Sequence, residues 1–175
     1  MLNENTVAPQ EVSEAQKPMR RAQPGKYLTF QLGDEEYAIG ILKVKEIIGM
    51  MPITAIPQTP EYVKGVINLR GKVIPVIDLR LRFGMEEAEY TDRTCIIVVE
   101  VDFEGEPLVM GLVVDAVSEV AQIKEDEIED TPSFGTSLDT NYILGMAKTE
   151  DSVEIILDID RILSESELNQ LHGTF

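Results

Sequence analysis

Few side chains in this sequence could carry out catalysis or hold a metal ion. Its 175 residues include one cysteine, Cys95, and one histidine, His172, which lies in a polar tail near the end. Histidine-assisted catalysis needs an imidazole held by packed elements, and a structural zinc ion needs about four cysteine or histidine ligands. Cys95 stands in the apolar run TCIIVVEV, which is typical of a buried strand. The sequence therefore predicts no catalytic residue and no metal site.

Acidic side chains are numerous, but their spacing does not match a calcium-binding loop. The segments DFEGE (102–106) and EDEIED (125–130) could attract calcium, yet neither follows the pattern of an EF-hand. The sequence also lacks the glycine-rich motifs that cradle phosphate, so we expect no cofactor. One enzymatic alternative is a hydrolase that uses Asp78 with Arg70, although no nucleophile stands near either residue.

Arg70 interrupts an otherwise apolar stretch, GVINLRGKVIPVIDLR, together with Asn68 and Gly71. Glycine and asparagine tolerate a positive φ, so NLRG predicts a tight turn that presents Arg70 at a rigid corner. Arginine is favoured at protein interfaces because its planar guanidinium donates several hydrogen bonds. Two interpretations stay open at this point: an internal ion pair between Arg70 and a nearby acid, such as Asp78, or contact with a partner protein.

The charge of the chain excludes several classes of partner. The formal net charge is −17, whereas nucleic acids and anionic membranes bind basic surfaces. Residues 25–84 carry a net charge of +2 and residues 85–175 one of −19, so the two halves either face different partners or the acidic half serves solubility. No apolar run could span a membrane or act as a signal peptide. We therefore expect a cytoplasmic protein without direct membrane insertion.

The elements that must position these residues are short. Alternating polarity predicts a strand over 28–32, which turns at Gly33–Asp34 and returns through 37–39. The apolar spacing in ILKVKEII predicts a short helix or helical turn over 41–48. A short extended piece follows between Pro52 and Pro57.

The rest of the chain continues this pattern. TPE at 59–61 is typical of a helix start, and we expect a short helix from there to residue 67. Further expected elements are a strand over 73–79 bent at Pro75, a hairpin around Glu104–Gly105, strands near 141–149 and 153–160, and a C-terminal helix after the Ser164–Glu167 capping box. Many short strands with small helices indicate small β-barrels or sandwiches. Residues 1–25 lack periodicity and predict a disordered tail.

Three segments of the sequence resemble the CheW family of chemotaxis coupling proteins. They are FQLGDEEYAIGILKVKEI, IPQTPEYVKGVINLRGKVIPVIDLR and MGLVVDAVSEV, and the resemblance runs from about Tyr27 to Leu163. It implies a mostly β fold with short helices over residues 26–165, in which two small five-stranded SH3-like β-barrel lobes surround a shared core. Residues 166–175 would then form a C-terminal helix or tail. The family members are adaptors without catalytic activity.

The resemblance also implies partners and contact positions. CheW-like proteins bind the cytoplasmic tip of methyl-accepting chemotaxis receptors and the regulatory domain of the histidine kinase CheA, and so are held at membrane receptor arrays through partners. A coupler in a related array, for twitching motility or non-motility signalling, would have the same fold and stays open. By motif match the implied receptor-binding positions are Val44, Glu46, Gly65, Asn68 and Arg70, and Thr94 is a further position for contact with the kinase or another partner.

Overall fold

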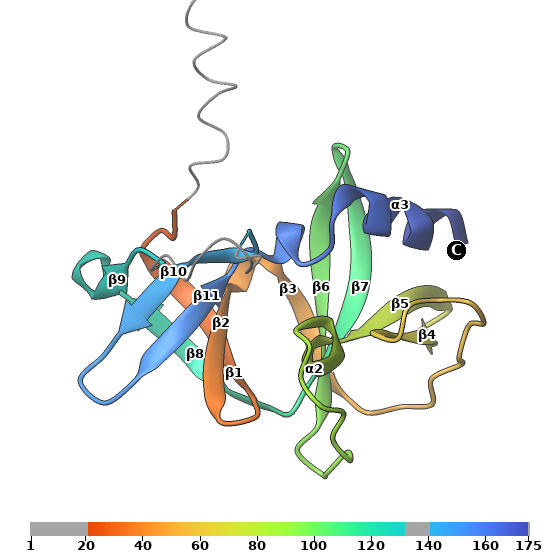
Figure 1. Ribbon diagram of the computed structural model, residues 1–175, viewed down its shortest axis with the longest axis horizontal. Coiled ribbons are helices and arrows are strands. Elements are labelled where there is room, and N and C mark those ends of the chain that lie inside the picture. The colour runs from red at the N-terminus through yellow and green to blue at the C-terminus, as the bar shows by residue number, and fades with distance from the viewer. Residues whose placement is uncertain (1–20, 132–140, 175) are drawn as a thin grey trace, which may run out of the picture.

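Short extended segments, as the sequence predicts, pair into two β-sheets in a computed structural model that describes residues 21–131 and 141–174. Within these residues one sheet has six strands and the other has five, and we call them the six-stranded and five-stranded lobes (Figure 1). The six-stranded lobe contains β1 (Gly25–Leu32), β2 (Glu35–Gly40), β8 (Ala116–Ile123), β9 (Ile128–Glu129), β10 (Ile143–Lys148) and β11 (Val153–Leu157). The five-stranded lobe contains β3 (Val44–Gly49), β4 (Val63–Leu69), β5 (Lys72–Asp78), β6 (Cys95–Phe103) and β7 (Glu106–Val114). The helical elements are η1 (Ile41–Lys43), α2 (Leu79–Arg82), η2 (Glu125–Glu127), η3 (Ile159–Arg161) and α3 (Glu165–Thr174).

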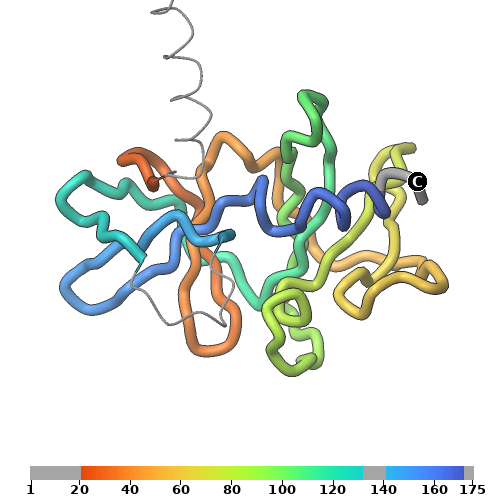
Figure 2. Tube along the Cα trace, turned by 45° about the horizontal axis from the view of Figure 1, so that its top comes forward, coloured from red at the N-terminus to blue at the C-terminus, as the bar shows by residue number. Residues whose placement is uncertain are grey.

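The chain passes from the six-stranded lobe to the five-stranded lobe after β2 and returns after β7, as the colours of Figure 2 show. The strand orders are β8-β1-β2-β11-β10-β9 and β3-β6-β7-β5-β4. Neighbouring strands are antiparallel except for β2 with β11 and β5 with β7. The β2–β11 contact joins hairpins that are distant in sequence, whereas the β5–β7 contact joins two consecutive hairpins.

A shared apolar core holds the two lobes together, as expected. Alternating residues of β1, including Phe30, face this core with Ile97 and Leu112 of the other lobe. Leu168 and Leu171 of α3 complete it, so the C-terminal helix is packed on both sheets' common core. Each lobe also has a smaller apolar cluster of its own. Burial of this apolar surface is the main stabilising contribution to such a fold.

Several predicted elements are confirmed. The first hairpin turns at Gly33–Asp34, and the long β6–β7 hairpin turns at Glu104–Gly105. The capping box begins α3: the Ser164 hydroxyl accepts from the Glu167 amide at 3.2 Å, and the Ser164 amide donates to the Glu167 carboxylate at 2.7 Å. These features depend on neighbouring residues in the sequence, which is why the sequence pattern identifies them.

Two predicted helices are wrong. Only η1, residues 41–43, is helical in the segment 41–48, and Val44–Gly49 is strand β3. The segment 59–67 turns at Pro60 and then becomes strand β4 instead of a helix. Both segments are rich in valine and isoleucine, and pairing with β6 and β5 favours the extended state of such residues over a short helix.

The predicted extended piece between Pro52 and Pro57 pairs with β4 through Thr54. The Thr54 and Val66 amides each donate to the other residue's carbonyl at 2.9 Å. Most of the predicted disordered tail, residues 1–20, lies outside the described residues, as does the side chain of His172. Ala22, at the end of the predicted tail, is buried in the core of the six-stranded lobe. Ala22 therefore belongs to the folded lobe, although it falls within the predicted tail.

Candidate protein-interaction surface

Arg70 lies at the tip of the β4–β5 hairpin, in a two-residue turn with Gly71. The φ angles of Arg70 and Gly71 are 52° and 89°, which is the backbone that such hairpin turns require. The Asn68 side-chain oxygen accepts from the Gly71 amide at 2.8 Å and closes the turn. The predicted corner is therefore present, although strands flank it on both sides instead of a helix and a strand. A turn fixed in this way presents the Arg70 guanidinium from a defined position.

Glu46 of β3 forms an ion pair with Arg70. β3 and β4 are the two opposite edges of the five-stranded sheet, so this pair shows that the sheet curls until its edges approach. Two of the residues implied by the family resemblance are thus brought into contact, although they are far apart in sequence. Arg70 therefore does form an internal ion pair, as one of the two open interpretations held, but its acidic partner is Glu46 and not Asp78.

The Glu46–Arg70 pair is exposed enough to be weak. The Arg70 side chain is 69% exposed and that of Glu46 is 32% exposed. Ion pairs at this level of exposure contribute about 0.2–1 kcal/mol to stability. A partner carboxylate could therefore replace Glu46 at small cost in free energy. This geometry suits a contact residue better than a residue that stabilises the fold.

Val44 and Gly65 lie next to this corner but play structural parts in the isolated chain. Val44 is half-buried at the start of β3 and packs against the shared core. Gly65 has a φ of 141°, and a Cβ atom there would lie 2.7 Å from the Thr54 carbonyl carbon and still closer to its oxygen. Gly65 therefore permits the Pro52–Pro57 segment to cross β4 closely. Val44 and Gly65 would therefore contribute to an interaction surface through the shape of the backbone and not through protruding side chains.

Thr94 and Asp78 do not join this surface. Thr94 is buried before β6, and its hydroxyl accepts from the Thr91 amide at 2.9 Å. Asp78 is 3% exposed and caps α2 by accepting from the Leu81 amide at 3.2 Å. Burial raises the pKa of the Asp78 carboxyl, and the Leu81 amide opposes this. The suggested hydrolase pair of Asp78 and Arg70 is therefore absent from the described residues.

The sequence patterns missed three exposed apolar side chains near the corner. Leu42 of η1 is 96% exposed, and Ile47 on β3 and Val73 on β5 also face solvent. Ile47 follows Glu46 directly, and Val73 lies three residues after Arg70. In the helix predicted over 41–48, Leu42 does not belong to the apolar face formed by Ile41, Val44 and Ile48. This mismatch was the available sequence signal that Leu42 is exposed. Because side chains alternate along a strand, Ile47 points to the opposite side of β3 from Glu46. Exposed apolar residues of this kind are candidates for contact with a partner protein.

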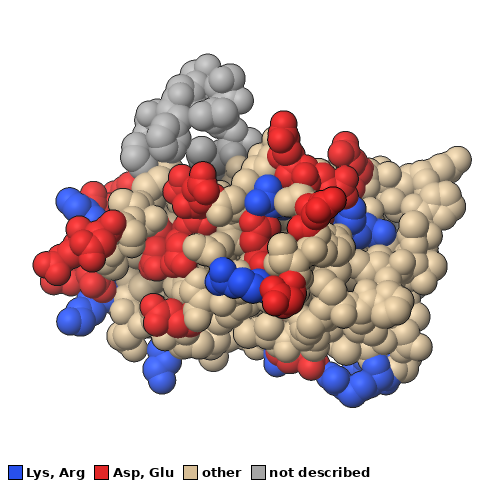
Figure 3. Space-filling model, turned by 90° about the horizontal axis from the view of Figure 1, so that it is seen from below, with Lys and Arg blue, Asp and Glu red and all other residues tan. Residues whose placement is uncertain are grey.

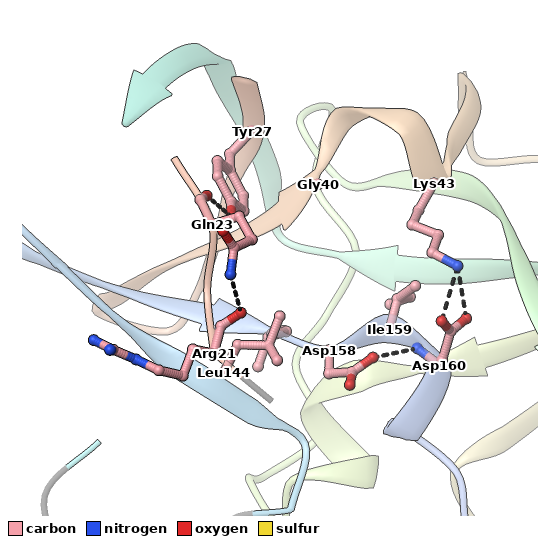
Figure 4. A pocket seen from close by; sticks show the side chains of 10 residues that line it. Arg21, Gln23, Tyr27, Gly40, Lys43, Leu144, Asp158, Ile159 and Asp160 are labelled. Atoms are coloured by element: carbon pink, nitrogen blue, oxygen red, sulfur yellow. Dashed lines mark hydrogen bonds and ion pairs between the residues drawn. The ribbon is translucent and has the colours of Figure 1, made fainter. Parts of the chain in front are cut away.

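A pocket of about 530 Å³ opens where the N-terminal segment, η1 and η3 meet (Figure 4). Lys43 and Asp160 form an ion pair of 2.8 Å at one side of it, and the Tyr27 hydroxyl donates to the Gln23 carbonyl at the other. Asp160 also accepts from the Asp102 amide of β6 at 3.0 Å, so it ties η3 to the five-stranded lobe. Lys43 and Asp160 are thus engaged in structural contacts, and the described residues that line the pocket do not form a catalytic arrangement. Among the described residues no cluster of cysteine, histidine or acidic side chains could hold a metal ion.

The distribution of charge separates the two ends of the molecule. On the face shown in Figure 3, acidic side chains gather over the left-hand lobe and the centre. The right-hand end of that face, where β4 and β5 lie, is mostly uncharged. Of the 23 acidic residues in the second half of the sequence, ten lie in 116–157, which contains strands β8 to β11 of the six-stranded lobe, and only two basic residues offset them, so this segment carries a net charge of −8. The Arg70 corner belongs to the less charged lobe.

Comparisons with known proteins agree with this description. A family model described as CheW-like domain matches residues 26–167. The chain is 40% identical to chemotaxis protein CheW of Klebsiella aerogenes, over 82% of this chain and 84% of that protein, and 34% identical to CheW of Treponema pallidum, over 82% and 85%. The crystal structure of the scaffolding protein TtCheW from Thermoanaerobacter tengcongensis superposes with a TM-score of 0.71 at 41% identity, covering 83% of this chain and 97% of that one. In the described part of the chain, the helices are too short or too polar to cross a membrane.

Proposed function

Because this chain belongs to the CheW family of non-enzymatic chemotaxis adaptors, we propose that it couples methyl-accepting chemotaxis receptors to the regulatory domain of the histidine kinase CheA. The adaptor holds receptor and kinase in a fixed relative geometry, so that the receptor's conformation biases kinase activity. It acts in the cytoplasm and reaches the membrane only through the receptors. Each contact is modest in strength, and the array supplies avidity.

The observation that carries this proposal is the Arg70 corner. Its backbone is fixed by the Asn68 hydrogen bond, and its guanidinium is held only by an exposed ion pair with Glu46. Leu42 and Ile47 supply exposed apolar surface nearby along the chain. A receptor tip is a helical hairpin, and an exposed arginine together with exposed apolar side chains suits such a partner. We propose that Val44, Glu46, Gly65, Asn68 and Arg70 shape the receptor-binding surface, and that the turn held by Thr94 before β6 belongs to a separate contact with the kinase or another partner.

The test is Arg70→Ala, assayed by binding to a purified receptor-tip fragment and to the CheA regulatory domain. We expect receptor affinity to fall at least tenfold, because a central interface arginine typically contributes more than about 1.4 kcal/mol. Kinase binding and the far-ultraviolet circular dichroism spectrum should be unchanged. Lys26→Ala is the matched control, since it removes one exposed positive charge from β1 in the other lobe. Unchanged receptor affinity in Arg70→Ala would remove Arg70 from the surface.

A charge-swapped double variant separates the ion pair from the arginine itself. Glu46→Arg combined with Arg70→Glu keeps an ion pair between β3 and the hairpin but moves the guanidinium to β3. We expect the fold to be retained and receptor binding to stay weak. Recovery of full binding would mean that the ion pair, and not the position of the guanidinium, is what the receptor needs.

A coupler in a related array is the second candidate, since the same adaptor fold serves either system. Co-purification from the native cell separates the two, because it identifies the kinase and receptors that accompany the chain. Recovery of a CheA-type kinase with methyl-accepting receptors supports the chemotaxis proposal. Recovery of a twitching-motility or non-motility kinase instead would favour the alternative.

A further inference from the structure

The six-stranded sheet has one parallel contact, between β2 and β11. It joins the N-terminal hairpin, β1–β2, to the C-terminal hairpin, β10–β11. In this contact Glu36 lies directly opposite Glu154, followed by the pairs Tyr37–Ile155 and Ala38–Ile156. Two carboxyl groups therefore face each other across the junction of the two hairpins.

Glu154 is buried at this junction, with only 8% of its surface exposed, whereas Glu36 is partly exposed. Glu154 lies on the same side of β11 as Ile156, which is in the lobe's own core. Because residues opposite each other on neighbouring strands point to the same side of the sheet, the two carboxyl groups are within reach of each other. The Ser118 hydroxyl of β8 donates to the Glu36 carboxylate at 2.7 Å. A buried carboxyl that contacts another carboxyl can form a hydrogen bond only if one of the two holds a proton.

Every other charged group that faces Glu154 is also acidic. β8 contributes Glu119, and η2 contributes Glu127. On the remaining neighbour, β10, the residue opposite Glu154 is the uncharged Ala147. Among the ion pairs of the described residues, none includes Glu36 or Glu154. With no cation to neutralise two negative charges, a shared proton is the remaining way to relieve their repulsion.

We propose that Glu36 and Glu154 share one proton, and that this proton fastens the two hairpins of the six-stranded lobe in a pH-dependent way. Below neutral pH the protonated carboxyl donates to its neighbour and the β2–β11 contact is tight. When the proton leaves, two carboxylates repel each other across a buried strand contact. The six-stranded lobe then becomes less stable, without any change at the Arg70 corner.

The direction of the pH dependence of stability follows from which state, folded or unfolded, binds the proton more strongly. Burial and the neighbouring Glu36 raise the pKa of Glu154 from its usual 4.5 to about 7. The folded state therefore holds a proton that the unfolded state releases at lower pH. Its contribution to stability is fully present below pH 4.5 and is lost as the pH rises toward about 7. Carboxyl groups with ordinary pKa values do not titrate in the upper part of this range.

The first experiment follows the glutamate carboxyl carbons of the full-length, 13C-labelled protein by NMR between pH 4 and pH 9. We expect one glutamate to titrate with a midpoint above about 6 and its signal to be absent in Glu154→Gln. Glu36→Gln should lower that midpoint, because it removes the neighbouring negative charge. Glu35→Gln, an exposed neighbour on β2, is the matched control and should leave the midpoint unchanged. Glutamate midpoints that all lie below about 5.5 would overturn the proposal.

The second experiment measures urea unfolding at pH 5 and at pH 8. In the wild type the equilibrium constant for unfolding should rise roughly tenfold or more between these values because of this pair. In Glu154→Gln, and independently in Glu36→Gln, the rise should be at least threefold smaller, because neutral glutamine keeps a hydrogen bond at either pH. Both variants retaining the full wild-type dependence would show that the pair does not share a functional proton.

Discussion

Gly65→Ala tests how the Pro52–Pro57 segment is held against β4, next to the Arg70 corner. A Cβ atom on residue 65 would lie 2.7 Å from the Thr54 carbonyl carbon, closer still to the carbonyl oxygen, and 3.0 Å from the Ala55 Cα. Contacts this short cannot be relieved by rotating a side chain, because the atoms that the Cβ would meet belong to the backbone. The segment must therefore move away from β4, and the two 2.9 Å hydrogen bonds between Thr54 and Val66 are lost.

The expected cost can be worked out from these contacts. A residue other than glycine with a φ near 141° costs about 1–3 kcal/mol in backbone strain. Two lost backbone hydrogen bonds cost about 0.5–1.5 kcal/mol each. We therefore expect Gly65→Ala to lower the free energy of unfolding by about 2–6 kcal/mol. A domain of this size is typically stable by about 5–15 kcal/mol, so the variant should fold but be clearly weakened.

Urea unfolding of the purified variant measures this difference, and Gly40→Ala provides the control. Gly40 has a φ of −57°, and no atom lies within 4 Å of the place that an alanine Cβ would take, so alanine there should change stability by less than about 1 kcal/mol. If Gly65→Ala costs less than about 1 kcal/mol, the close approach of Thr54 to β4 is not a feature of the protein in solution. Receptor binding should also weaken in Gly65→Ala, since the corner's support is displaced.

Two further substitutions test contacts that fasten the elements around the shared core. Asp115→Asn should lower the free energy of unfolding by about 1–3 kcal/mol in urea at pH 7, because the carboxylate accepts from Arg80 at 2.6 and 2.8 Å and from the Gly33 amide at 2.8 Å. Burial raises the pKa of Asp115, but Arg80 and the Gly33 amide together lower it by more, so the pKa lies below its usual value of 3.8. The difference in free energy of unfolding between wild type and Asp115→Asn should therefore shrink as the pH falls below 3.8. A difference that stays constant down to pH 3 would contradict this. Tyr62→Phe should cost about 0.5–1.5 kcal/mol, because its hydroxyl donates to Glu167 of α3 at 2.8 Å. Burial and Glu167 raise the pKa of Tyr62 to about 12, so the variant should lack one late-titrating tyrosine in an ultraviolet titration, and an unchanged titration would refute the contact.

The hairpins show which parts of the fold local sequence can predict. Gly33–Asp34 and Glu104–Gly105 turn where expected, since φ preferences of single residues decide tight turns. The capping box at Ser164 is local for the same reason. The segments 41–48 and 59–67 have an apolar spacing that also fits a helix, which is why the helix prediction is wrong there. Strands β6 and β5 decide their state, because they lie elsewhere in the sequence and provide hydrogen-bonding partners.

The candidate surface divides in the same way. The motif NLRG predicts a turn that displays Arg70, and the turn is present. The ionic partner of Arg70 was not predictable, because Asp78 and Glu46 are both acidic and the sequence does not show which of them lies close to Arg70 in the folded chain. Curling of the five-stranded sheet brings β3 to the hairpin and buries Asp78 under α2. Closure of a sheet depends on all of its strands together, and no single segment encodes it.

Sequence alone determined that this protein is a non-enzymatic adaptor of mostly β structure, because composition, turn residues and family motifs are properties of the chain itself. The tertiary structure decided which side chains meet. It paired Arg70 with Glu46, set Gly65 against Thr54, and placed Glu36 opposite Glu154. Each of these contacts joins residues from different strands or loops. Strand register and sheet closure create such contacts, and their energies depend on burial and on neighbouring charge that exist only in the folded molecule.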